Sequence, residues 1–171
     1  MTSDKYSIDE TGLSILEILE NDSRISDEDI AGQLDLDVRE VQTRIERYRK
    51  DGIIVRYTTH VNWERIRRDE IVHALIEVQL TPQRGTGFDA IAEAVYRFDE
   101  VRSVVLLSGS YDLLVSVEGP SLQYVALFVA EKLSVIEGVR STVTHFRLRT
   151  YKENGQILVG STHAKRIPFS F

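Results

Sequence analysis

The chain has 171 residues, of which 42% are hydrophobic and 28% are charged, and it contains no cysteine. This composition is typical of a folded globular protein, and it excludes disulfide bonds, thiolate metal sites and cysteine nucleophiles. No apolar run approaches the roughly 20 residues of a membrane-spanning helix, and the polar start of the chain does not resemble a secretory signal. We therefore expect a cytoplasmic protein without membrane contact, made of one domain or two small ones.

The net charge of −6 is distributed unevenly along the chain. Residues 1–37 contain two basic and eleven acidic side chains, whereas residues 38–56 contain six basic and three acidic ones. A local basic stretch within an acidic protein is a weak indication of contact with a polyanion such as nucleic acid.

Capping residues and apolar spacing predict consecutive helices over 9–21, 26–34 and 38–50. Each start pairs a capping side chain with an acidic residue three positions later: Ser7 with Glu10, Ser26 with Asp29, and Asp37 with Glu40. Gly52 ends the third helix, and the alternating β-forming residues of 53–61 predict a short hairpin. This order is typical of a winged helix-turn-helix domain, which we assign to residues 1–61.

The outer face of the third predicted helix carries side chains that can contact DNA in the major groove. At about 100° per residue, its exposed arc and edge hold the predicted contacts Arg39, Gln42, Thr43, Arg47 and Lys50, joined by Arg56 from the hairpin. The alternative is that this arc is only the solvated face of an amphipathic helix. Arg44 lies on the flank, where it can either bind a carboxylate of the domain or touch DNA.

A charged stretch over 62–70 is predicted to be a linker, and the pattern then becomes β-α-β repeated twice. The expected strands are 71–80, 101–108, 111–117 and 139–151, and the expected helices are 88–98 and 121–136. This order predicts an α+β protein whose residues 71–152 form a ferredoxin-like domain, with both helices on one face of an antiparallel sheet. Apolar residues in both alternating sets of the strands suggest that the second face is buried in a homodimer. Residues 153–171 are predicted to be a C-terminal tail.

Short motifs in a specific order extend over most of the chain. In the first half they are Ile8-Asp9, Arg24-Ile25-Ser26, Ile30-Ala31, Arg44-Ile45, Asp51-Gly52-Ile53-Ile54 and Tyr57. In the second half they are Gly109-x-Tyr111-Asp112, Gly138-Val139, Thr142-x-Thr144 and Lys152. In this order and spacing, the chain from Ile8 to about Lys152 resembles the Lrp/AsnC (leucine-responsive, feast/famine) family of transcriptional regulators.

The resemblance implies a sequence-specific, double-stranded-DNA-binding regulator whose dimers often assemble into octamers. It also implies that a small effector, usually an amino acid, binds where dimers meet, close to the Gly-x-Tyr-Asp turn. By position, the ligand-binding residues would be Gly109, Tyr111, Asp112, Thr142 and Thr144. The family usually has an acidic residue in this turn where the present chain has Ser110.

The chemistry of the turn is compatible with an amino-acid ligand. A glycine turn exposes backbone N–H groups to a carboxylate, and Asp112 could bind an ammonium group. The alternative is that Gly109 and Asp112 only shape the turn while Tyr111 packs at the edge of the sheet.

Two other functions remain open from the sequence. The first is a broadly binding architectural DNA protein or an effector-sensing partner of another regulator, which the ratio of specific to non-specific DNA affinity would distinguish. The second is an enzyme similar to the sirohaem decarboxylases, which need polar and basic residues on the sheet. Residues 104–107 are apolar here, and the histidines at 60, 73, 145 and 163 lack metal-ligand spacing. We therefore expect no enzyme, no catalytic residues, no cofactor and no metal.

Overall fold

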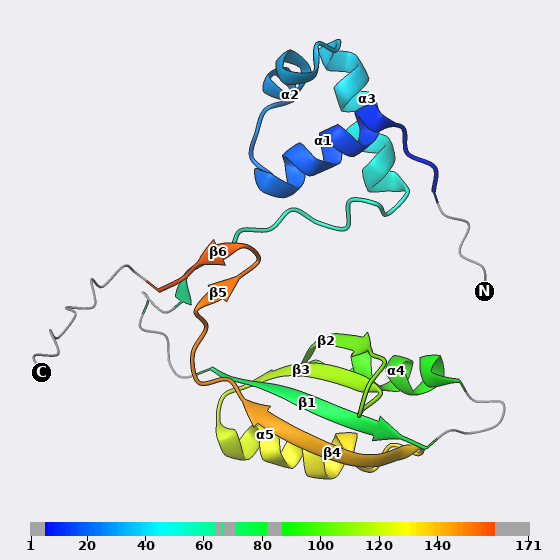
Figure 1. Cartoon of the computed structure of the whole chain (residues 1–171), viewed down its shortest axis with the longest axis vertical. Coiled ribbons are helices and arrows are strands. Elements are labelled where there is room, and N and C mark those ends of the chain that lie inside the picture. The colour runs from blue at the N-terminus through cyan, green and yellow to red at the C-terminus, as the bar shows by residue number, and fades with distance from the viewer. Residues whose placement is uncertain (1–5, 64–65, 67–70, 82–86, 160–171) are drawn as a thin grey trace, which may run out of the picture. The chain divides into compact units, whose positions relative to one another are not determined.

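In the computed structural model of the chain, the described residues are 6–63, 66, 71–81 and 87–159. They fall into two compact units, with the division after Val61 (Figure 1). Most of the predicted linker, 64–65 and 67–70, and residues 160–171 of the predicted tail lie outside the described residues.

The N-terminal unit contains α1 (Glu10–Asn21), α2 (Asp27–Leu34) and α3 (Val38–Lys50), in agreement with the sequence prediction. The predicted capping side chains Ser26 and Asp37 accept hydrogen bonds from the first turns of α2 and α3. The cap of α1 is Asp9, however, and not Ser7 as predicted. Asp9 is the better-placed acceptor because Arg44 of α3 holds its carboxylate at the start of the helix.

The helices of this unit enclose a core of their own. It consists of aliphatic side chains that recur at helical spacing: Ile15, Leu19, Ile30, Ala31, Val41 and Ile45. Ile54, just after α3, packs against the same core. The apolar stripe of α3 therefore faces inward, which fixes its charged residues on the outside.

The predicted hairpin over 53–61 is wrong. Ile53 and Ile54 both donate their backbone N–H groups to the carbonyl oxygen of Tyr48, which closes the end of α3. The segment then continues without forming a strand, and Val55 is 85% exposed. A hairpin needs a turn between its two strands, and residues 53–61 contain no glycine, asparagine, aspartate or proline to make one.

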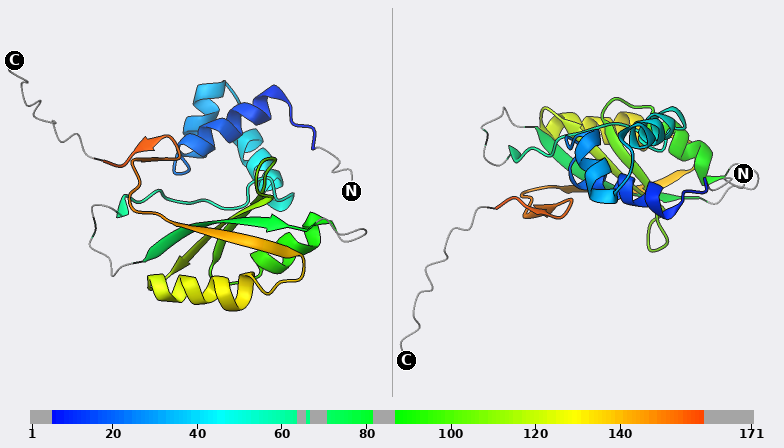
Figure 2. Two further views of the ribbon diagram at one scale, coloured as in Figure 1. Left: turned by 60° about the horizontal axis from the view of Figure 1, so that its bottom comes forward. Right: turned by 90° about the horizontal axis from the view of Figure 1, so that it is seen from above.

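The C-terminal unit contains a four-stranded sheet with the order β2-β3-β1-β4. Its elements are β1 (Val72–Leu80), α4 (Phe88–Tyr96), β2 (Val101–Leu106), β3 (Leu113–Gly119), α5 (Leu122–Phe128), the π-helical turn η2 (Val129–Leu133) and β4 (Val139–Phe146). All neighbouring strands are antiparallel, and α4 and α5 lie on one face of the sheet (Figure 2). This is the predicted ferredoxin-like arrangement.

The two faces of the sheet differ in burial. On the helix-covered face Ile76, Val78 and Val115 are fully buried. On the opposite face Leu75 is 42%, Val105 45% and Val143 51% exposed. The sheet of a single chain therefore leaves apolar side chains uncovered on one side.

The end of the C-terminal unit differs from the sequence prediction. The last strand of the sheet ends at Phe146 and not at 151. The last residue of the predicted domain and the first residues of the predicted tail form a small hairpin of β5 (Lys152–Glu153) and β6 (Gln156–Ile157). Its turn is Asn154-Gly155, in which both residues have positive φ. The side chain of Asn62 fixes the hairpin from outside by donating a hydrogen bond to the carbonyl oxygen of Leu158 (2.7 Å).

Candidate nucleic-acid interface and effector turn

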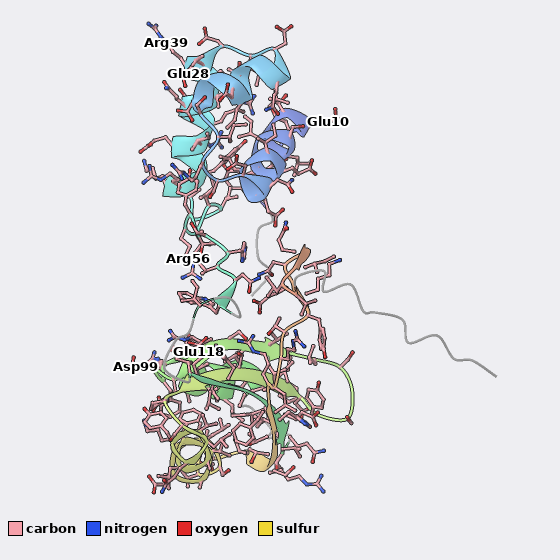
Figure 3. All side chains as sticks on the ribbon, turned by 90° about the vertical axis from the view of Figure 1, so that its left-hand side faces the viewer. Glu10, Glu28, Arg39, Arg56, Asp99 and Glu118 are labelled. Atoms are coloured by element: carbon pink, nitrogen blue, oxygen red, sulfur yellow. The ribbon has the colours of Figure 1, made fainter. Side chains whose placement is uncertain are left out.

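The outer face of α3 presents most of the residues that the sequence predicts for DNA contact. Arg39, Gln42, Thr43, Arg47 and Lys50 are all exposed on this helix, and Arg56 is exposed on the segment that follows it. Figure 3 shows Arg39 projecting outward from its helix. Between them the side chains supply donors for phosphate oxygens and for the base edges of the major groove.

A shallow groove of about 780 Å³ runs along this face from Gln42 to Asp51. Its lining consists of polar and charged side chains: Gln42, Thr43, Glu46, Arg47, Lys50 and Asp51. The groove thus brings together four of the predicted contacts, whereas Arg39 and Arg56 lie outside its lining.

Arg47 differs from the other predicted contacts because protein groups already hold it. Its guanidinium lies 5.3 Å from the ring centroid of Tyr6, and its Nε lies 3.6 Å from Oδ2 of Asp51. The Tyr6 hydroxyl in turn donates a hydrogen bond of 2.8 Å to the same Asp51 oxygen. Sequence analysis does not single out Tyr6, because it precedes the first helix and reaches α3 only in the folded unit.

Arg44 binds carboxylates of its own domain, which resolves the two possibilities that the sequence leaves open. Its guanidinium donates hydrogen bonds to Asp9 (2.8 Å) and to Glu40 (2.9 Å). The bond from Arg44, aided by the N–H of Gly12, lowers the pKa of the Asp9 carboxyl below its ordinary value. Arg44 therefore connects the start of α1 to α3. This contact helps to fix the outer face of α3, which we call the recognition face.

Gly12 allows α1 and α3 to approach closely. It is buried in α1, and a Cβ there would overlap the hydroxyl group of Tyr48 and lie 2.6 Å from a methyl carbon of Ile8. Tyr48 is itself buried in α3. The glycine is therefore required by packing at the contact that orients α3.

The turn over residues 109–112 connects β2 to β3, and its Asp112 carboxylate is engaged by the protein backbone. Oδ2 of Asp112 accepts a 2.7 Å hydrogen bond from the N–H of Leu80. That N–H lies where the pairing of β1 with β4 shifts register, between Gln79 and Leu80. The carboxylate thus satisfies a backbone group that the irregular sheet would otherwise leave unpaired.

Two residues that the sequence analysis does not select are connected to this turn: Gln79 contacts it directly, and Ser141 contacts Gln79. Gln79 donates from Nε2 to the carbonyl oxygen of Ser110 (2.8 Å) and accepts at Oε1 from the Ser141 hydroxyl (2.9 Å). We refer to Gln79, Ser110, Asp112 and Ser141 as the turn cluster. Strand alternation alone indicates the face of each residue, but strand order and register are needed to place the members together.

The remaining predicted ligand residues are divided between two places. Gly109 is exposed and Tyr111 is half-buried in the turn, and a Cβ on Gly109 would meet no atom within 4 Å. Thr142 and Thr144 pair with Val78 and Ile76 of β1. They are therefore on the helix-covered face of β4, opposite to Ser141.

The histidines on the sheet each lie beside a carboxylate. His73 lies 3.1 Å from Glu118, and His145 lies 3.0 Å from Glu77, so each is paired with one carboxylate. Across the residues that the structure describes, no group of histidine and acidic side chains has the arrangement of a metal site. Nor has any helix in these described segments the length and apolar character needed to cross a bilayer.

Comparison with known families identifies both units. Residues 8–55 match the model of a winged helix-turn-helix DNA-binding domain. Residues 73–157 match the model of the Lrp/AsnC ligand binding domain. The second match includes the β5–β6 hairpin, and the two matches together extend over most of the chain.

Individual relatives agree with these matches. The chain is 45% identical over 156 residues to the HTH-type transcriptional regulator YugG of Bacillus subtilis, covering 91% of this chain and 94% of that one. It is 33% identical over 145 residues to the HTH-type transcriptional regulator LysM of Saccharolobus solfataricus, covering 85% and 96%.

Solved structures show the same fold. AsnC of E. coli superposes with a TM-score of 0.66 at 22% identity, over 90% of this chain and all of that one. A transcriptional regulator of Neisseria meningitidis in complex with L-Met superposes with a TM-score of 0.66 at 23% identity, over 86% and 94%.

Proposed function

The chain belongs to the Lrp/AsnC family of DNA-binding transcriptional regulators, and from this premise we propose that it binds specific DNA as a homodimer under the control of an amino acid. Its activity is regulation and not catalysis, because its relatives are transcriptional regulators and its N-terminal unit is a DNA-binding domain. The observation that carries the proposal is the exposed polar face of α3, set on a helix whose apolar stripe is buried.

The recognition face supports specific binding because it combines positively charged hydrogen-bond donors with a side-chain amide. Arg39, Arg47 and Lys50 can contact guanine edges or phosphates, and Gln42 can bind an adenine edge with two hydrogen bonds. The acidic N-terminal part of the chain reduces attraction to DNA in general, which favours binding that depends on base contacts.

Dimerisation through the uncovered face of the sheet supports this mode of binding. The exposed side chains Leu75, Val105 and Val143 gain burial when a second sheet packs on them. The neighbouring pair Glu118–Arg102 places charges of both signs on the strands around them. Two recognition helices related by a twofold axis would contact half-sites about one turn of DNA apart.

The 109–112 turn is the candidate effector site. The exposed glycine gives a ligand close access to backbone N–H groups, and Tyr111, Asp112 and the polar turn cluster offer further partners. The Neisseria meningitidis neighbour is described in complex with L-Met, which suggests amino acids as the first class to screen. Thr142 and Thr144 remain second-choice contacts because they lie on the other face of β4.

Fluorescence anisotropy tests the central part of this proposal. The purified protein is first used to select a preferred duplex from a randomised pool, and its affinity is then compared with that for a scrambled duplex across a salt series. Binding at least about a hundredfold tighter to the selected duplex is expected of a specific regulator. Equal binding to both, falling steeply with salt, would contradict the proposal and indicate an architectural protein.

The effector is tested with the same complex. Each of the twenty amino acids is added to the protein on its selected duplex, and the change in affinity is measured. An effector alters DNA affinity only if it binds the DNA-competent and free states unequally. A ligand that binds without changing DNA affinity or assembly would contradict the regulatory role of this site.

A further inference from the structure

We infer that Tyr6, which lies before α1, is a positioning residue of the DNA interface and fixes Arg47 for contact with DNA. The inference rests on the proposed DNA-binding role of the α3 face. The three side chains involved, Tyr6, Arg47 and Asp51, come from the chain start and from the end of α3, and they form one closed cluster.

The geometry defines what each member does. The Tyr6 ring lies against the Arg47 guanidinium, whose Cζ is 5.3 Å from the ring centroid. Contact of a guanidinium with an aromatic face is attractive and limits the orientations that the side chain samples. Because a long arginine loses rotamer freedom when it binds, an arginine that is already restricted loses less of it on meeting DNA.

Asp51 gives the tyrosine hydroxyl a secondary role beside that of the ring. A carboxylate at the end of a recognition helix repels the phosphate backbone and competes with it for Arg47. The Tyr6 hydroxyl donates to Oδ2 of Asp51 at 2.8 Å, whereas Arg47 Nε lies 3.6 Å from that oxygen. The bond from Tyr6 to Asp51 is thus shorter than the contact between Arg47 and Asp51. The guanidinium of Arg47 is therefore bound less tightly by Asp51.

The surroundings of the cluster agree with a role in binding. Arg47 and Asp51 line the groove along α3 together with Gln42, Thr43 and Lys50, and Tyr6 is 39% exposed beside them. Partial burial and the hydrogen bond to Asp51 raise the pKa of Tyr6, so the hydroxyl remains a donor at neutral pH. In contrast, the start of α1 is joined to α3 separately, through Asp9 and Arg44.

A double-mutant cycle on the full-length protein tests this inference. The affinities of wild type, Tyr6→Ala, Arg47→Ala and the double variant are measured by anisotropy on the selected and scrambled duplexes. Tyr6→Ala is expected to weaken binding about three- to fivefold, as the loss of one exposed cation–π contact implies. In the Arg47→Ala background the same change is expected to have almost no effect, because Tyr6 acts through Arg47.

The conservative variant Tyr6→Phe keeps the ring and is expected to bind within about twofold of wild type. Tyr96→Ala, an exposed tyrosine of α4 in the other unit, is the matched control and is expected to bind as wild type. Thermal unfolding of each variant separates a loss of folding from a loss of positioning.

The outcomes separate failure of this inference from failure of the proposed function. Wild-type affinity in Tyr6→Ala, or an equal loss in the presence and absence of Arg47, would overturn the positioning role while leaving DNA binding intact. Equal wild-type affinity for both duplexes would contradict sequence-specific binding, and the cycle would still test Tyr6 on the DNA that is bound. Absence of binding to either duplex would overturn both.

Discussion

The outer face of α3 and the 109–112 turn differ in what their polar side chains already contact. Within the described residues, the side chains of Arg39, Gln42 and Lys50 have no hydrogen bond or ion pair with the protein. In the turn, Asp112 binds a backbone N–H and Gln79 bridges Ser110 and Ser141. DNA can therefore contact these three side chains without breaking protein contacts, whereas an effector must replace hydrogen bonds at the turn or bind beside them.

This contrast determines how substitutions should be interpreted. A change of Arg39, Gln42 or Lys50 removes a side chain that makes no hydrogen bond or ion pair within the described residues, so its effect on DNA binding is direct. A change in the turn cluster alters the sheet and the ligand site together. Matched control substitutions separate these contributions.

Leu75→Asp should have the largest effect, because it places a carboxylate on the uncovered sheet face proposed to pack against a second copy. Burying an unpaired charge is costly, and we expect the dimer to dissociate at least about a hundredfold more readily. Sedimentation equilibrium measures this, with Leu127→Asp on the exposed side of α5 as the control. An unchanged dimer in Leu75→Asp would show that the sheets do not pack together.

Gly12→Ala should destabilise the N-terminal unit by about 1–3 kcal/mol, because the new methyl group overlaps buried neighbours in a well-packed core. Denaturant unfolding measures the loss. The matched change Gly32→Ala in α2 meets no atom within 4 Å and should instead stabilise by about 0.5–1 kcal/mol. Equal effects of the two substitutions would contradict the close approach of α1 and α3.

Asp112→Ala should cost about 1–2 kcal/mol of stability, since it leaves the Leu80 N–H without its acceptor. Gly109→Ala has space for its methyl group and should leave stability unchanged while weakening any effector that approaches the turn closely. Unfolding and calorimetric titration of both variants are compared. Unaltered effector affinity in Gly109→Ala would place the ligand elsewhere and leave the turn with a structural role alone.

Arg44→Gln should have the smallest effect, and that effect should depend on pH. Arg44 lowers the pKa of Asp9 in the folded protein, so its stabilising contribution is present above about pH 4 and is lost as the pH falls further. The difference in Tm between wild type and Arg44→Gln should therefore shrink toward pH 2. The variant should select the same DNA sequence as wild type, because Arg44 supports the recognition face from its flank.

Capping and periodicity predicted the helices well because these signals are local. The bounds of α3 agree with Asp37 as its cap and Gly52 after its end. The hairpin predicted over 53–61 is absent because alternating β-forming residues do not form a hairpin in a segment that has no turn residues. Conversely, the β5–β6 hairpin could have been predicted, since Asn154-Gly155 is a strong turn signal.

The residues of a candidate site could be predicted from the sequence only where they all lie on one helix or strand. The α3 face follows from helical geometry, so five of its residues could be named from the sequence. Gln79 and Ser141 join the turn through strand order and register, and Tyr6 reaches Arg47 through tertiary packing. Such contacts between distant segments have no local signal in the sequence.

The most direct test of the central claim is to repeat the selection from randomised DNA with Arg39→Ala. Arg39 is exposed near the start of α3, and Arg49, which pairs with Glu46 on the same helix, provides the control variant Arg49→Ala. If α3 contacts bases, Arg39→Ala should relax the preference at one position of each half-site and lose about 1–3 kcal/mol on the wild-type duplex. An unchanged selected sequence with unchanged affinity would contradict the assignment of this face as the DNA-recognition surface.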